Sequence, residues 1–70
     1  MIVTDTTPQA YRIRLERDAA ARLRRTAAEF RAGRVTHVPA GSAYAEHYAA
    51  ECERQAAAAT ERANLLEGTW

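Results

Sequence analysis

Hydrophobic residues recur every three or four positions along two stretches of the chain that are nearly equal in length. Residues 8–32 and 43–67 contain no internal glycine, and the only proline, Pro8, stands at the start of the first stretch. Apolar side chains at this spacing line one face of an α-helix. The pattern therefore predicts two amphipathic helices, at about 8–32 and 43–67, and an all-α fold.

The residues at the ends of these stretches are typical of helix termini. Thr7 before Pro8 and Ser42 before the second stretch are predicted N-caps, because a hydroxyl accepts from a free backbone N–H. Gly33 supplies the left-handed C-terminal stop, and a turn follows over 33–42. Two equal helices joined by so short a connection cover each other only as an antiparallel hairpin.

The whole chain, 1–70, is predicted to be a single helical-hairpin domain with a short flexible or β-like segment at 1–6. An alternative is that 2–4 and 35–38 pair as a two-stranded ribbon. Ribbons of about four residues are unstable on their own, so this pairing is disfavoured.

Each predicted helix has an apolar stripe that should face the other helix. In the first helix the stripe contains Leu15, Ala19, Leu23, Thr26, Ala27 and Phe30. In the second it contains Ala45, Tyr48, Ala49, Cys52, Ala56, Ala59, Ala63 and Leu66. The second stripe is mostly alanine, which predicts a close, coiled-coil-like approach of the two helix axes.

Charge is divided unequally between the two halves. Residues 12–34 hold eight arginines and three acidic residues, whereas 37–70 hold two arginines and five acidic residues, and the whole chain carries a net charge of +1. Several arginines have an acidic neighbour four positions away, which favours pairing within the helix. These local pairs are Arg12–Glu16, Arg14–Asp18, Arg22–Asp18 and Arg25–Glu29.

Three further arginines recur every seven residues and predict a ladder between the helices. The second helix has Glu46, Glu53, Thr60 and Glu67 at the same spacing. An antiparallel hairpin with its turn near Val38 then pairs Arg31 with Glu46, Arg24 with Glu53, and Arg17 with Thr60. Exposed pairs contribute only about 0.2 to 1 kcal/mol each, so the ladder selects register more than it stabilises.

A nucleic-acid surface is the less favoured interpretation of the basic first helix. Its candidate phosphate contacts are Arg14, Arg17, Arg24, Arg25 and Arg31. Affinity for phosphate comes largely from counterion release by a surplus of positive charge. A net charge of +1, with the two halves neutralising each other, favours internal pairing or an acidic protein partner instead.

No constellation of residues predicts catalysis, a cofactor or a metal site. His47 and Glu51 lie four apart and could share a metal, but we expect a solvated pair. Ser42 is explained as a cap, and Cys52 as a small apolar side chain on the stripe. We therefore expect a protein that is not an enzyme.

Size and composition predict a thin core and a cytoplasmic location. Of the 33 hydrophobic residues, 17 are alanine, and chains of this size bury only about 60% of their unfolded surface. The single cysteine cannot form an internal disulfide. The first residues lack the features of a signal peptide, and no stretch is apolar enough to span a membrane.

Apolar positions outside the stripes predict self-association. The second helix has a further alanine-rich edge at Ala43, Ala50, Ala57, Ala58 and Leu65, although alanine also serves as helix-favouring filler. The predicted interface residues are Tyr11, Ile13, Tyr44, Ala50, Ala57, Leu65 and Trp70. We expect a homodimer forming a four-helix bundle that acts by protein binding, as an adaptor, inhibitor or assembly factor. The alternatives are a nucleic-acid-associated regulator and small-molecule binding at an oligomer interface.

Overall fold

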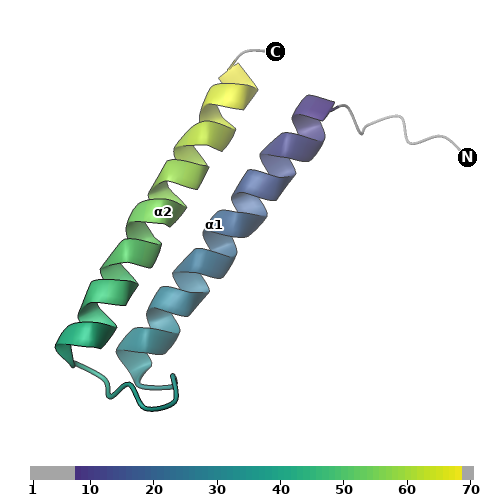
Figure 1. The fold of residues 1–70 in the computed structure, drawn as a ribbon. Helices are drawn as coiled ribbons and strands as arrows, with labels where there is room; N and C mark the ends of the chain where they lie inside the picture. The colour runs from purple at the N-terminus through teal and green to yellow at the C-terminus, as the bar shows by residue number, and fades with distance from the viewer. Residues whose placement is uncertain (1–7, 69–70) are drawn as a thin grey trace, which may run out of the picture.

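The chain forms an antiparallel pair of α-helices in a computed structural model that describes residues 8–68 (Figure 1). Helix α1 spans Pro8–Ala32 and helix α2 spans Ala43–Gly68. The helices lie side by side along their length, and the connection closes one end (Figure 1). The predicted helices and their hairpin arrangement are therefore confirmed, whereas the predicted cap Thr7 and the 1–6 segment lie outside the described residues.

Helix α1 ends in a Schellman motif. Gly33 has a φ of 74°, its N–H donates to the carbonyl of Phe30 at 3.2 Å, and the N–H of Arg34 donates to the carbonyl of Glu29 at 3.0 Å. These two bonds satisfy carbonyls that the helix itself leaves unpaired. Glycine adopts this φ without a steric penalty, which is why the helix stops here.

Helix α2 begins at the predicted Ser42 cap. The Ser42 hydroxyl oxygen accepts from the N–H of Ala45 at 3.1 Å, and the Ser42 N–H donates to the Pro39 carbonyl at 3.2 Å. Upstream, the N–H of Val38 donates to the Val35 carbonyl at 3.1 Å, so 35–38 form a turn. The ribbon alternative is not formed by this segment, and its other half, 2–4, lies outside the described part of the chain.

The two helices meet along a line of small residues. The buried side chains of the described chain are Ile13, Ala20, Ala27, Ala45, Ala49, Ala56, Ala59 and Ala63. The alanines predicted for the α2 stripe are thus confirmed. Ala20, Ala56 and Ala59 form one buried cluster, with Leu23 packed against it.

The predicted stripe of α1 is right only in part: Ala27 is buried and Leu23 packs against the core, but the line of contact runs along a different edge of the helix. Ile13, Ala20 and Ala27 are buried at heptad spacing, whereas Leu15 is 44% exposed and Thr26 is exposed. The axes approach most closely where the side chains are smallest, so the line of contact follows Ala20 and Ala27. The larger side chains of the predicted stripe lie on its flank.

The core of the hairpin is consequently thin. Among residues 8–68 no large side chain is fully buried, and Ile13, at 7% exposed, is the largest in the core. A buried methyl or methylene group contributes only about 0.8 kcal/mol, so a line of alanines stabilises a hairpin weakly. Neither described helix combines the length and apolarity that crossing a membrane requires.

We expect Gly33→Ala to destabilise the hairpin more than Gly41→Ala. Both glycines have a positive φ, of 74° and 79°, which costs an L-residue about 1 to 2 kcal/mol. A Cβ at position 33 would also lie 3.1 Å from the Cβ of Ala40, whereas one at position 41 meets nothing within 4 Å. Urea unfolding followed by circular dichroism measures both losses, and equal losses would contradict the close approach at Gly33.

Candidate interaction surfaces

One side of the hairpin carries a ladder of polar contacts between α1 and α2. Its donors are the three arginines at heptad spacing on α1. The contacts, defined here as the ion ladder, are Arg31 with Glu46 (3.3 Å), Arg31 with Glu53, Arg24 with Thr60 (2.9 Å), Arg17 with Asn64 (3.3 Å) and Arg17 with Glu67 (2.7 Å). All these side chains remain accessible to water at the edge of the pair.

The ladder is displaced from the predicted pairing by one heptad. Arg31–Glu46 is confirmed, but the predicted pairs Arg24–Glu53 and Arg17–Thr60 are wrong. Side chains tilt toward the N-terminus of their own helix, so in an antiparallel pair the arginines of α1 lean away from the turn while the carboxylates of α2 lean toward it. Each long arginine therefore reaches a partner farther along α2.

Arg31 is the arginine of the ion ladder that has two carboxylate partners. It lies between Glu46 and Glu53 and binds both carboxylates. The hydrogen bond that Arg31 donates to Glu53, reinforced by the charges of both glutamates, raises the pKa of the Arg31 guanidinium despite some desolvation. The ladder is thus anchored next to the turn, where the two chain segments are already held together.

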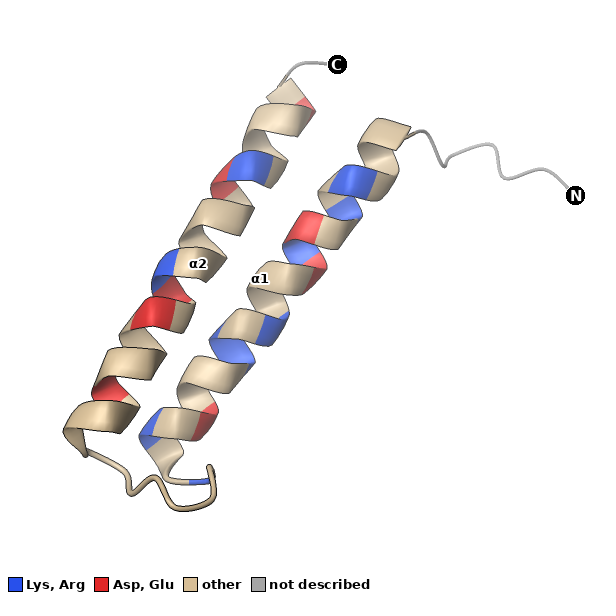
Figure 2. Cartoon of the chain, in the orientation of Figure 1, with Lys and Arg blue, Asp and Glu red and all other residues tan. Residues whose placement is uncertain are grey.

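The acidic residues of α1 do not form the predicted local pairs. Glu16 accepts from Arg62 of α2 at 3.1 Å, and Glu29 lies 3.9 Å from Arg34. The remaining arginines of α1 have no ion-pair partner among residues 8–68, and these are Arg12, Arg14, Arg22, Arg24 and Arg25. Figure 2 shows the result: basic residues dominate α1, and acidic residues outnumber basic ones on α2.

Three aromatic rings bridge the helices next to the turn. Phe30 of α1 stacks on Tyr48 of α2 with ring centroids 5.9 Å apart and lies 6.5 Å from Tyr44. The two tyrosine rings are 4.5 Å apart. At 100° per residue, the three rings lie on one side of the contact line between the helices, and the side chains of the ion ladder lie on the other side. The rings therefore occupy the flank opposite the ion ladder.

The aromatic rings continue into a broader apolar surface along this flank. We define the apolar face as Leu15, Ala19, Leu23 and Phe30 of α1 with Tyr44, Tyr48 and Cys52 of α2. Leu15, Tyr44 and Tyr48 are 44%, 56% and 40% exposed, and the other four are half-buried. Aromatic and aliphatic side chains left this open form a typical interaction surface.

The Tyr44 hydroxyl is affected by its neighbour on the same helix. A hydrogen bond with Tyr48 raises the pKa of Tyr44, and partial desolvation acts in the same direction. His47 packs edge-on against the Tyr48 ring, with centroids 5.1 Å apart. The predicted pairing of His47 with Glu51 is wrong, because Glu51 binds Arg54 one turn further on. Within residues 8–68 no three side chains of the His, Cys, Asp and Glu types gather to hold a metal.

The residues predicted as an interface do not share one surface. Tyr11 and Leu65 are 52% and 66% exposed, Ala57 is exposed and Ala50 is half-buried. Ile13 was expected to lack cover, and this expectation is wrong because the hairpin itself buries it. Tyr44 belongs to the apolar face, and Trp70 lies outside the described residues.

The sequence interpretation missed Leu15, Leu23 and Phe30 as surface residues because it assigned them to the line of contact. The heptad spacing of Ile13, Ala20 and Ala27 was the signal that locates that line correctly.

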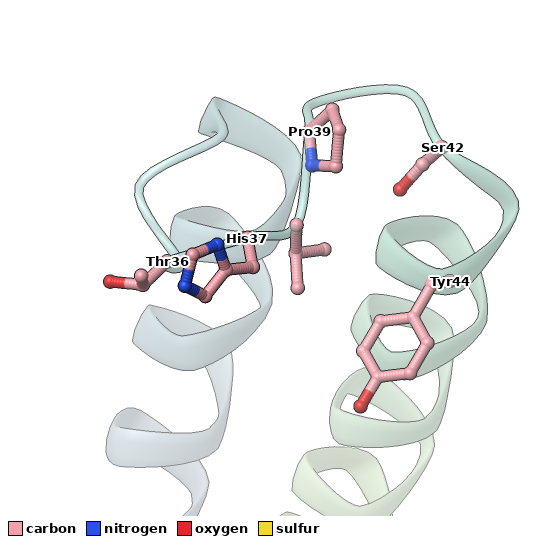
Figure 3. Close-up of a pocket in the computed structure, with 6 residues that line it drawn as sticks. Thr36, His37, Pro39, Ser42 and Tyr44 are labelled. Atoms are coloured by element: carbon pink, nitrogen blue, oxygen red, sulfur yellow. The ribbon is translucent and has the colours of Figure 1, made fainter.

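A cavity of about 450 Å³ opens beside the turn (Figure 3). Its lining residues come from the loop and the first turn of α2: Thr36, His37, Val38, Pro39, Ser42 and Tyr44. His37 has a φ of 67°, a left-handed conformation that histidine adopts more readily than most residues. Thr36, His37 and Tyr44 are exposed, and the Ser42 hydroxyl already caps α2. The cavity therefore presents no buried polar group to orient a small ligand.

Comparison of the chain with protein-family models, with curated proteins and with solved structures found no match. The function must accordingly be argued from the geometry of the hairpin. The strongest feature of that geometry is the contrast between its two flanks, one closed by the ion ladder and the other mainly apolar, with the Glu16–Arg62 pair at its far end from the turn.

A double-mutant cycle tests the displaced register of the ion ladder. We expect Arg17→Ala and Glu67→Ala to show a coupling energy of about 0.2 to 1 kcal/mol, since the two charges meet at 2.7 Å at an exposed edge. The matched cycle of Arg17→Ala with Thr60→Ala should show no coupling. Urea unfolding gives both coupling energies. Coupling of Arg17 with Thr60 but not with Glu67 would support the pairing predicted from the sequence.

Replacing Tyr48 with phenylalanine should lower the pKa of Tyr44. The variant keeps the ring contacts but removes the hydroxyl that stabilises the neutral Tyr44 phenol. In the native protein the contribution of this bond to stability is complete below pH of about 10 and is lost as the pH rises through the folded-state pKa. Tyrosine ring NMR across an alkaline titration measures the shift, with Tyr11→Phe at the other end of α1 as the control that should leave Tyr44 unchanged.

Proposed function

We propose that this chain is a non-enzymatic interaction protein that works as a homo-oligomer, most simply a dimer of hairpins forming a four-helix bundle. The single observation that carries the proposal is the apolar face, where large side chains lie open beside a core built from one isoleucine and seven alanines. A helix pair buries its larger apolar residues only when a second layer covers them.

The energetic argument concerns where the large side chains lie. Phe30, Tyr44 and Tyr48 contact one another but remain partly in water, and Leu15 is nearly half exposed. Complete burial of a large apolar side chain contributes about 1.5 to 3 kcal/mol, compared with about 0.8 for a methyl group. Covering the apolar face therefore contributes more stabilising free energy than burial of the alanine contact line contributes by itself.

The role of such an assembly is binding to another protein, as an adaptor, inhibitor or assembly factor. A four-helix bundle of this kind keeps the outer faces of α1 and α2 in solvent, where unpaired arginines and exposed acids are available to a partner. We place the protein in the cytoplasm, because its single cysteine is a free thiol that a reducing compartment preserves.

The arrangement of the arginines supports protein binding over the nucleic-acid alternative. Arg17, Arg24 and Arg31, three of the five candidate phosphate contacts, bind α2 through the ion ladder. Arg14 and Arg25, together with Arg12 and Arg22, are left without an ion-pair partner among the described residues. With five acidic residues in 37–70 and a net charge of +1, the hairpin as a whole releases few counterions, so these arginines provide little affinity for a phosphate backbone.

Leu15→Glu should dissociate the oligomer, whereas Ala57→Glu should leave it intact. The first variant places a carboxylate in the apolar face, and the second places one on the solvent side of α2. Burying an unpaired charge costs several kcal/mol, so we expect the dissociation constant of the Leu15→Glu dimer to rise by a factor of about 100 or more.

Sedimentation equilibrium of the native chain and both variants measures this effect. A native chain that remains a folded monomer at micromolar concentration would contradict the proposed function. Dissociation by Ala57→Glu but not by Leu15→Glu would instead assign the interface to the outer edge of α2.

A further inference from the structure

We propose that the apolar face is covered by a second copy of this chain, docked with α1 of one hairpin lying across α2 of the other and with both turns at the same end. This inference rests on the proposed function and specifies its geometry. Two hairpins stacked through one face by two-fold symmetry have two simple arrangements, with the axis either along the helices or across them. The first places α1 over α2 of the partner, and the second places α1 over α1.

The area of the face suits a second copy. The helices are about 37 Å long at 1.5 Å per residue, and two helices side by side are about 20 Å wide, which gives a face of roughly 700 Å². A stable dimer buries about 800 Å² per partner. The Cα atoms span only 11 Å in the thinnest direction, so the hairpin is a single layer with one whole side open to a second copy, and the apolar face covers the part of that side nearer the turn.

The distribution of charge selects between the two arrangements. Residues 12–34 carry eight arginines against three acids, and 37–70 carry five acids against two arginines. Stacking α1 on α1 would bring two strongly basic helices together and leave two acidic helices together. Stacking α1 on α2 places opposite charges on the rims of every contact, and this lowers the electrostatic energy without any specific pair.

The aromatic cluster points to the same arrangement. With both turns at one end, Phe30, Tyr44 and Tyr48 of the two copies meet near the two-fold axis as a continuous aromatic layer. With the turns at opposite ends, each cluster would lie over the Glu16–Arg62 pair of the other copy. Only the arrangement with both turns at one end lets the aromatic rings of the two copies pack on one another.

A distance between the two turns tests this arrangement. In the full-length chain carrying Cys52→Ala, a nitroxide label on Thr36→Cys reports the separation of the two loops by pulsed electron spin resonance. Thr36 is exposed on the loop and does not belong to the apolar face. We expect a separation of roughly 10 to 25 Å, compared with about 40 Å or more when the turns lie at opposite ends of a 26-residue helix.

The outcomes separate the inference from the proposed function. A short distance in a sample whose mass is that of a dimer supports the arrangement, and adding Leu15→Glu should then abolish the dipolar signal. A dimer with the long distance overturns the arrangement while the proposed self-association stands. A monomeric mass for the Cys52→Ala chain and for the native chain overturns both.

Discussion

The close approach of α1 and α2 along a line of alanines is the constraint on which the rest of the structure depends. Ala20 of α1 meets Ala56 and Ala59 of α2, and each is about 1% exposed. A larger side chain at any of these positions would force the axes apart, because a packed interior leaves no free volume to receive it. The contact is thus defined by shape and contributes little free energy from apolar area.

The alanine line determines where every larger side chain can lie. Since the space between the axes at Ala20 and Ala27 is too narrow for a leucine or an aromatic ring, Leu23 and Phe30 lie beside the contact line and Leu15 lies further out. On the opposite flank the same geometry brings long arginines within reach of carboxylates on α2. One flank is therefore closed by polar contacts, and the other is left with the apolar area that the hairpin does not bury.

The sequence predicts the helices well because their signals are local. Gly33 and Ser42 mark the ends by their own backbone and hydroxyl chemistry, and both act as predicted. The orientation of α1 about its axis depends on the partner helix, so counting apolar residues gave a stripe centred on the wrong edge. The predicted pairs of the ion ladder were wrong for a related reason. Heptad spacing determines which edge of the helix a side chain occupies, but the tilt of the side chain determines which partner it reaches.

The two flanks of the hairpin contribute to specificity in different ways. Exposed ion pairs are weak, and the ion ladder serves mainly to exclude other registers of α1 on α2, in each of which arginines would lose their partners. The apolar face does not select a register in this way, because aromatic and aliphatic side chains still make contacts when one surface shifts along the other. In the proposed dimer, selection of the second copy on that face would come from its rims, where the basic α1 and the acidic α2 carry opposite charge. A fold with a nearly neutral net charge can thus still discriminate strongly, because what a docking surface recognises is the order of the charges and not their sum.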